Sequence, residues 1–224
     1  MLRMMVAVLL AAGMGSAQDW KALLNGKNLD GWEVVGDGFW QVTSDGTLLG
    51  ERRPSKSEPA AGSPTITRAQ YNGWRDQQSW LYTKRNDFTN FDLHVEFWTR
   101  TMGNSGISIR DSSRGKWGVT IPPEYTRTPS KIGYEIQINN QYPDPHPTGS
   151  IYGFMDAKAG AQKDNEWNSM DIESRPEMIR VKVNGILVAE HPGDPKRPKV
   201  GPIGLQLHDQ FSVIQFRNVR IREY

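Results

Sequence analysis

The sequence contains no cysteine in its 224 residues. This absence excludes disulfide bonds, thiolate metal centres, iron–sulfur clusters and cysteine nucleophiles. Histidine is also scarce, with four residues, and neither an H-E-x-x-H zinc motif nor an Asp-rich calcium loop occurs. We therefore predict that the protein has no metal site and no cofactor.

The sequence also lacks an excess of charge of one sign and any long hydrophobic run. The 27 basic and 25 acidic residues are dispersed and give a net charge of +2, so no nucleic-acid partner is predicted. The one apolar run, residues 4–12, is much shorter than the ~20 residues needed to cross a bilayer, so no membrane span is predicted.

The N-terminus has the pattern of a secretory signal peptide. Arg3 supplies a basic start, residues 4–12 form an apolar segment, and residues 15–17 (Gly-Ser-Ala) form a small-residue cleavage site. We predict a signal peptide over residues 1–17 and export to the periplasm or the medium. Residues 18–224 have enough apolar content for one hydrophobic core, so they are predicted to form a single domain.

Apolar residues recur at every second position in many short segments of the chain. This period is typical of strands with one buried face, and Gly, Asn, Asp and Pro bound the segments. Asn184-Gly185 between two such segments predicts a tight hairpin, and a change of parity near Arg217-Asn218 predicts a bulge in the last strand. We predict an all-β fold, an antiparallel β-sandwich of the jelly-roll type.

Three longer segments interrupt the strand pattern, at residues 51–78, 111–131 and 142–149. They are rich in Pro, Gly, Ser and charged residues and have no clear period. Loops of this length in a compact domain often border a binding or catalytic site, although ordinary surface loops are an equal alternative.

Directional hydrogen-bonding groups lie opposite the apolar residues on three of the predicted strands. Because Ile107, Ile136 and Leu205 are expected to face the core, the alternate residues should share one outer surface if the strands are in one sheet. These alternate residues are Asn104, Ser108, Arg110, Glu135, Gln137, Asn139, Gln206 and His208. Such an array of donors and acceptors suits the hydroxyl groups of a sugar. The alternative is a polar sheet surface whose side chains satisfy one another.

Tryptophan could supply an apolar platform for a sugar ring beside this polar face. Trp80, Trp98 and Trp167 are the candidates, and we expect at least one ring face to be exposed at the site.

A conventional glycosidase needs two carboxyl groups about 5 to 9 Å apart. Glu135 is the one clear carboxylate on the predicted polar face, which is not the expected pair. A second carboxylate could come from the edges and loops, at Asp111, Glu96, Asp209 or Glu166. His208 is the one histidine among the candidate site residues. A lone histidine on a polar face is more often structural, but a neighbouring Glu135 strengthens the case for proton transfer.

Several sequence blocks occur in the same order as in one protein family. They include residues 24–32 (Leu-Asn-Gly-Lys-Asn-Leu-Asp-Gly-Trp), 104–107, 134–138, 148–153, 166–168 and 201–208. Over nearly the whole chain after the signal peptide, the sequence resembles the domain of unknown function 1080 family, described as 3-keto-disaccharide hydrolases. The resemblance implies a fold like that of concanavalin A-like lectins and glucanases, with two curved antiparallel sheets and a ligand groove on one of them.

The resemblance also implies a substrate, an oxidised sugar or glycoside whose C3 carries a ketone. The ketone makes the C2 proton acidic, so one base can remove it and an oxyanion stabiliser can hold the enolate that expels the C1 oxygen. For this chemistry we assign Glu135, His208 and Arg110 as the catalytic residues. Either Glu135 or His208 is the base and the other is the acid or orienter, and Arg110 holds the enolate together with Gln206 or Gln137. The implied substrate-binding residues are Asn104, Gln137, Asn139, Gln206, Trp167 and Trp98.

Two other functions fit the same polar face. The first is a secreted, non-catalytic carbohydrate-binding module, because lectin-like folds serve both binding and catalysis. The second is a structural surface protein whose polar face contacts another protein.

Overall fold

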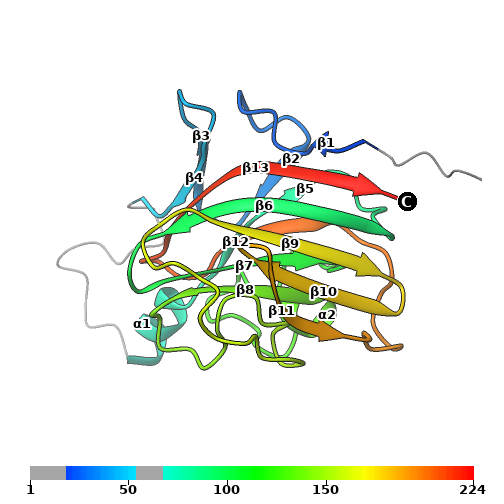
Figure 1. Cartoon of the computed structure of the whole chain (residues 1–224). Coiled ribbons are helices and arrows are strands. Elements are labelled where there is room, and N and C mark those ends of the chain that lie inside the picture. Colours follow the sequence, from blue (N-terminus) through cyan, green and yellow to red (C-terminus); the bar gives the residue numbers. More distant parts are fainter. Residues whose placement is uncertain (1–18, 54–67) are drawn as a thin grey trace, which may run out of the picture.

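The computed structural model describes residues 19–53 and 68–224 of the chain. The predicted signal peptide, residues 1–17, and part of the first predicted loop lie outside the described residues. Two antiparallel sheets pack face to face (Figure 1). The prediction of an all-β antiparallel sandwich is therefore confirmed.

The larger sheet has eight strands. Along its path lie β11 (Ile186–His191), β10 (Met178–Val183), β9 (Asn168–Arg175), β6 (Phe91–Thr99), β13 (Val213–Glu223), β4 (Leu48–Glu51) and β3 (Phe39–Val42), and β1 (Lys21–Ala22) pairs with β13. The hairpin between β10 and β11 turns at Asn184 and Gly185, whose φ angles of 51° and 78° suit a type I′ turn. The β6–β13 register shifts between Arg217 and Arg220, so the hairpin and the bulge are both confirmed.

The smaller sheet has five strands and carries the predicted polar face. Its order is β2 (Trp32–Val35), β5 (Ser79–Thr83), β12 (Ile203–Leu207), β7 (Gly103–Ile109) and β8 (Tyr134–Asn140). The three strands expected to share a sheet, β12, β7 and β8, are direct neighbours in it. Two short helices, α1 (Arg68–Arg75) and α2 (Pro129–Ile132), lie within the first and second predicted loops.

The hydrophobic core fills the space between the two sheets. Ile107, Ile136 and Leu205 are completely buried in it, as the alternation predicts. Full burial of each such side chain stabilises the fold by roughly 1.5–3 kcal/mol. The register of the small sheet is therefore fixed, because a slip by one residue would bring all these side chains to the polar face.

The second predicted loop folds back over the small sheet and is anchored by Asp111. Its Oδ1 accepts hydrogen bonds from the Ser113 amide (2.9 Å) and hydroxyl (2.7 Å), and its Oδ2 accepts them from the Tyr82 hydroxyl (2.8 Å) and the Gly115 amide (2.7 Å). Gly115 has a φ of 70°, and a Cβ there would lie 2.6 Å from Cδ1 of Trp80. The loop thus covers Trp80 closely.

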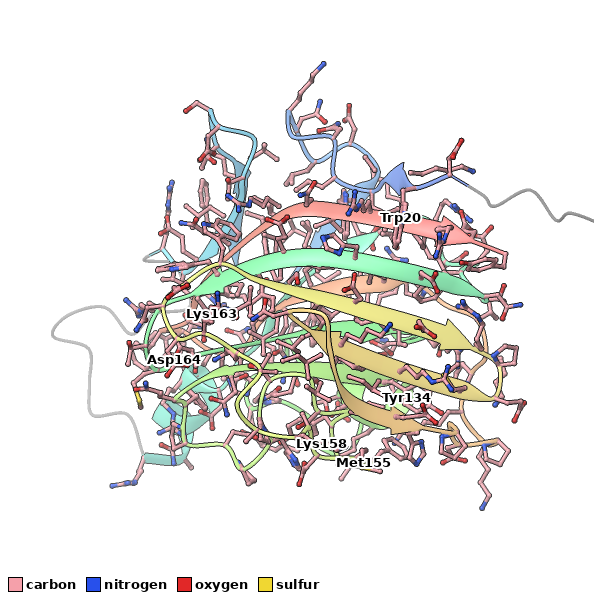
Figure 2. The ribbon with its side chains drawn as sticks, viewed as in Figure 1. Trp20, Tyr134, Met155, Lys158, Lys163 and Asp164 are labelled. Atoms are coloured by element: carbon pink, nitrogen blue, oxygen red, sulfur yellow. The ribbon has the colours of Figure 1, made fainter. Side chains whose placement is uncertain are left out.

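The outer face of the large sheet carries charged pairs. His94 Nδ1 lies 2.6 Å from Asp171 Oδ1, and the His94 ring meets Trp20, which Figure 2 labels beside β13. In the described part of the chain, no helix has the length and apolar character needed to cross a membrane.

Candidate active site

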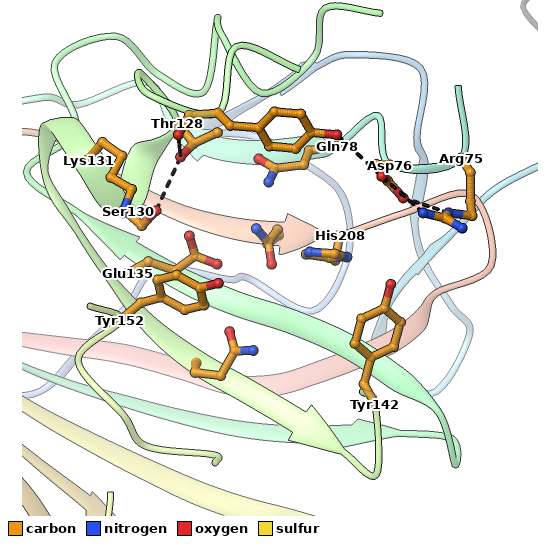
Figure 3. A pocket seen from close by; sticks show the side chains of 13 residues that line it. Arg75, Asp76, Gln78, Thr128, Ser130, Lys131, Glu135, Tyr142, Tyr152 and His208 are labelled. Carbon is orange, nitrogen blue, oxygen red and sulfur yellow. Dashed lines mark hydrogen bonds and ion pairs between the residues drawn. The ribbon is translucent and has the colours of Figure 1, made fainter. Parts of the chain in front are cut away.

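A cavity of about 360 Å³ opens on the outer face of the small sheet (Figure 3). Its floor consists of Glu135 and Gln137 on β8, Gln206 on β12 and His208 just after β12. Its walls come from the three predicted loops: Arg75, Asp76 and Gln78 from the first, Tyr125, Thr128, Ser130 and Lys131 from the second, and Tyr142 from the third, with Tyr152 shortly after it. The cavity therefore combines the predicted face with side chains from all three insertions.

A glycine makes the recess that holds the Glu135 carboxylate. In the β7–β8 pairing, Ser108 lies opposite Glu135 and Gly106 opposite Gln137. A Cβ on Gly106 would lie 2.6 Å from Oε1 of Glu135 and 2.9 Å from its Cγ. The carboxylate of Glu135 therefore occupies the space that any other residue at position 106 would fill with its own side chain.

Glu135 has an unusual proton affinity. It is 4% exposed, and burial raises its pKa from 4.5 to about 7, although the His208 charge and the Gln206 amide act in the opposite direction. The negative charges of Asp144 and Asp111 raise it further. A carboxyl group with this pKa can both take and release a proton near neutral pH, as proton-transfer chemistry requires.

His208 lies at the end of the floor, with a side chain that is 24% exposed. Its Nδ1 is 3.4 Å from Oδ2 of Asp209, and its ring meets the Tyr142 ring edge to face at 5.3 Å. Because the charge of His208 acts on Glu135, the two groups share one electrostatic environment. The structure thus brings together the two residues that the sequence predicted as the acid and base pair.

Three amide side chains lie on the floor or beneath it. Gln137 Nε2 donates to Oδ1 of Asn104 at 3.3 Å, and Asn104 is completely buried and supports Gln137 without lining the cavity. Gln206 is close enough to lower the pKa of Glu135, but neither of its polar atoms reaches hydrogen-bond geometry with the described residues. Gln206 is completely buried, and its amide acts on the Glu135 carboxylate.

The prediction that Arg110 faces the cavity is wrong. Arg110 follows β7 directly and has a φ of 61°, which ends the strand's alternation. Its side chain is 1% exposed, and its Nη2 donates to the carbonyl oxygens of Arg175 at 2.7 Å and Thr89 at 3.4 Å. Arg110 is thus a buried structural cation away from the cavity.

Asn139 lies on β8 two residues beyond Gln137 but does not line the cavity. Its Nδ2 donates to the carbonyl oxygens of Asp144 (3.1 Å) and His146 (3.2 Å), and its Oδ1 accepts the Tyr142 amide (2.8 Å). These bonds fix the start of the third loop and occupy the side chain. The structure therefore contradicts direct substrate binding by Asn139 and instead shows that it positions the loop.

The prediction that a tryptophan borders the cavity is also wrong. Trp98 lies on β6 of the other sheet and donates from Nε1 to the Asn165 carbonyl oxygen at 3.1 Å, and the Trp167 ring is covered by the Arg217 guanidinium at 4.1 Å. Trp80 is in the small sheet, but the second loop buries it completely.

Tyrosines, which the sequence reasoning did not single out, line the cavity instead. Tyr152 donates to Oδ2 of Asp144 at 3.1 Å, and Tyr125 donates to Oδ2 of Asp76 at 3.3 Å. Burial raises the pKa of Tyr142 and Tyr152, so both phenols stay protonated at neutral pH. The signal that could have found Tyr125 and Tyr142 is their position in the interrupting segments, which were expected to border a site. Tyr152 lies shortly after the third segment.

The remaining wall residues are held by short polar contacts (Figure 3). Arg75 donates to both carboxylate oxygens of Asp76, at 2.6 and 3.1 Å, and the hydroxyls of Thr128 and Ser130 are 3.2 Å apart. Lys131 adds a cation to the same wall as Ser130. Within residues 19–53 and 68–224, no group of three or more His, Cys, Asp or Glu side chains has an arrangement that could hold a metal ion.

Several known structures share this architecture. A lectin from Bauhinia forficata in complex with GalNAc has a TM-score of 0.55 at 13% identity, over 92% of this chain and 98% of the lectin. The carbohydrate-binding module CBM66 from Bacillus subtilis has a TM-score of 0.54 at 14% identity, over 86% of this chain and 96% of the module. The fold is therefore a lectin-like β-sandwich.

The sequence also matches a family model, which is more specific than a similarity of fold. The chain belongs to the family described as the 3-keto-alpha-glucoside-1,2-lyase-like domain, which matches residues 19–222. A candidate glycosyl hydrolase from Parabacteroides distasonis has a TM-score of 0.64 at 26% identity, over 92% of this chain and 100% of that chain. No curated protein matches the sequence. The family and these relatives place the chain among carbohydrate-active proteins.

Proposed function

We propose that the protein cleaves the glycosidic bond of 3-keto-glycosides, including 3-keto-disaccharides, by removing the proton on C2. The observation that carries the proposal is Glu135, a buried carboxyl group with a pKa of about 7 on the floor of a polar cavity. Membership of the 3-keto-alpha-glucoside-1,2-lyase-like family supports the same chemistry.

The reaction starts when the base takes the C2 proton and the C–H electron pair forms the C2=C3 bond of an enolate. The enolate then returns its electrons, so C3=O re-forms, a C1=C2 double bond appears and the C1–O bond breaks. The leaving oxygen takes a proton from the acid. Addition of water across C1=C2 completes a net hydrolysis, whereas release of the unsaturated ketone completes an elimination.

Glu135 is assigned as the base and His208 as the acid. Glu135 is a buried residue of the floor, and its pKa lets the ionised form exist at neutral pH while remaining a strong enough base to accept a proton. Because Arg110 lies away from the cavity, stabilisation of the enolate is assigned to Lys131 and to the side-chain amides of Gln137 and Gln206.

A two-carboxylate glycosidase mechanism fits this cavity less well. The second carboxylate among the residues that line it is Asp76, whose two oxygens already accept hydrogen bonds from Arg75 and from the Tyr125 hydroxyl. An ionised, paired carboxylate is a weak acid catalyst. Elimination needs one proton-transfer carboxylate, and the cavity supplies one.

The test is to incubate the purified protein with a 3-keto-glucoside and, in parallel, with the unoxidised glucoside, and to measure release of the aglycone. We expect release from the oxidised compound alone. Release from the unoxidised glucoside at an equal rate would refute the elimination route. Binding of sugars without turnover of either compound would favour the second candidate function, a non-catalytic carbohydrate-binding module. The structural similarity to CBM66 supports this candidate.

We also propose that the protein is exported, on the evidence of its N-terminal sequence. N-terminal sequencing of protein recovered from the producing cells should find a mature start near Gln18. An intact Met1 would refute export by cleavage of residues 1–17.

A further inference from the structure

We propose that Asp209 is a positioning residue that holds the His208 ring with Nδ1 turned towards the protein and Nε2 turned towards the substrate. This inference rests on the proposed function, because it assigns a task to a residue behind the acid. The observation that carries it is a buried carboxylate whose contacts are divided between the protein and His208.

One oxygen of Asp209 is fixed by the chain that follows it. Oδ1 accepts hydrogen bonds from the Phe211 amide (2.8 Å), the Ser212 amide (2.7 Å) and the Ser212 hydroxyl (3.0 Å). Asp209 is 2% exposed, so these bonds are shielded from water. The carboxylate therefore cannot rotate without breaking them, and Oδ2 is directed at His208 Nδ1, 3.4 Å away.

A buried cation, Arg52, interacts electrostatically with Asp209. The Arg52 side chain is 4% exposed, pairs with Asp37 and donates from Nη2 to the Gln77 carbonyl oxygen at 2.6 Å. Burial lowers the pKa of Arg52 to about 10, and the charge of Asp209 acts against that shift, so the two groups interact. Arg52 thus helps to keep Asp209 ionised.

The ionisation of Asp209 follows from the same contacts. Burial alone would raise its pKa, but the hydrogen bond and charge of His208, together with the Phe211 amide and the Ser212 hydroxyl, lower it to about 2. Asp209 is therefore negative throughout the neutral range. A fixed negative charge beside Nδ1 of His208 stabilises the tautomer that carries the Nδ1 proton.

The ring of His208 has two further neighbours that matter for proton transfer. The Tyr142 ring packs edge to face against it at 5.3 Å, which restricts its rotation, and the Glu135 carboxyl shares its electrostatic environment across the floor. With Nδ1 committed to Asp209, the opposite edge of the ring, Nε2, is the atom available to the leaving oxygen.

The test is Asp209→Asn, measured by NMR of the histidine ring nitrogens and by kinetics on a 3-keto-glucoside. We expect the His208 ring to lose its preference for an Nδ1 proton. We also expect kcat to fall by at least roughly tenfold. This loss should be smaller than the 10²–10⁴-fold loss expected when a general acid itself is removed, and KM should stay within about threefold of the wild-type value.

The matched control is Asp171→Asn. Asp171 Oδ1 contacts His94 Nδ1 at 2.6 Å on the outer face of the other sheet, so this variant removes the same kind of pair without touching the cavity. We expect altered His94 signals with kcat unchanged. If Asp209→Asn fails to fold, Ser212→Ala removes one donor to Oδ1 and should shift kcat and the His208 signals in the same direction by a smaller amount.

The inference is overturned if His208 keeps its tautomer in the Asp209→Asn protein, or if kcat is unchanged. Failure of the proposed function is a separate outcome. In that case the wild-type protein turns over no 3-keto-glycoside, whereas the NMR comparison of Asp209→Asn with Asp171→Asn still decides whether Asp209 orients His208.

Discussion

The raised pKa of Glu135 predicts that this residue lowers the stability of the protein at neutral and alkaline pH. Its pKa is 4.5 in an unfolded chain and about 7 in the folded protein, with burial as the main cause. The folded state therefore binds the proton more tightly than the unfolded state between these values. The contribution of Glu135 to stability should therefore be greatest below pH 4.5 and should be lost as the pH rises to about 7.

The size of the effect follows from the difference in pKa. At 1.36 kcal/mol per unit, a shift from 4.5 to about 7 corresponds to about 3 kcal/mol of unfolding free energy. Glu135 is 4% exposed, so solvent screening reduces this little. Glu135→Gln removes the titration and should be more stable than wild type by about this amount at pH 8, or roughly 6–12 °C in Tm for a domain of this size.

The assay is urea unfolding of the wild-type and Glu135→Gln proteins at several values between pH 4 and pH 9. The difference between their unfolding free energies should grow through the window from 4.5 to 7 and then become constant. Glu177→Gln, whose side chain is 83% exposed, should show no such pH-dependent difference. A constant difference between wild type and Glu135→Gln across this range would show that Glu135 is ionised normally and would refute the base assignment.

The kinetics of Glu135→Gln and two further variants test the placement of these residues. Glu135→Gln should lower kcat on a 3-keto-glucoside by roughly 10² or more and leave KM within a few-fold, and near wild-type turnover would reduce Glu135 to a binding role. Gly106→Ala, which places a Cβ 2.6 Å from the Glu135 carboxylate, should lower kcat while changing the midpoint of urea unfolding little, and unchanged kinetics would refute the recess. Arg110→Met should lower stability, because it leaves the Arg175 carbonyl oxygen without its donor, and a loss of kcat in a protein of unchanged stability would contradict the placement of Arg110.

The fold was predictable because its signals are local. Alternation with a period of two decides which face of a strand is buried, and the identities of Ile107, Ile136 and Leu205 suffice to orient three strands. The Asn184-Gly185 hairpin follows from the positive φ angles that these residues tolerate. The grouping of Glu135, Gln137 and Gln206 on one floor is a direct consequence of this alternation.

The errors arise where one residue or one distant loop overrides the alternation. Arg110 has a left-handed backbone conformation, which an arginine in the sequence does not indicate. The strand alternation therefore predicted the wrong position for its side chain. Trp80 does face the outer side of the small sheet, opposite Gln206, but the loop anchored by Asp111 covers it. Coverage by a loop depends on contacts between residues far apart in the sequence, which a strand pattern does not contain.

The same loops explain why the raised pKa of Glu135 could not be predicted from the sequence. A glutamate on the outer face of a sheet would ordinarily be solvated, and its pKa would remain close to 4.5. Here Gly106 provides a recess for the carboxylate, and the surrounding walls take it out of water, which raises the pKa. The insertions thus turn a lectin-like surface into a closed environment suited to proton transfer. Ionisation of the buried Glu135 costs about 3 kcal/mol of unfolding free energy. Glu135→Gln should therefore be more stable than wild type and have a lower turnover.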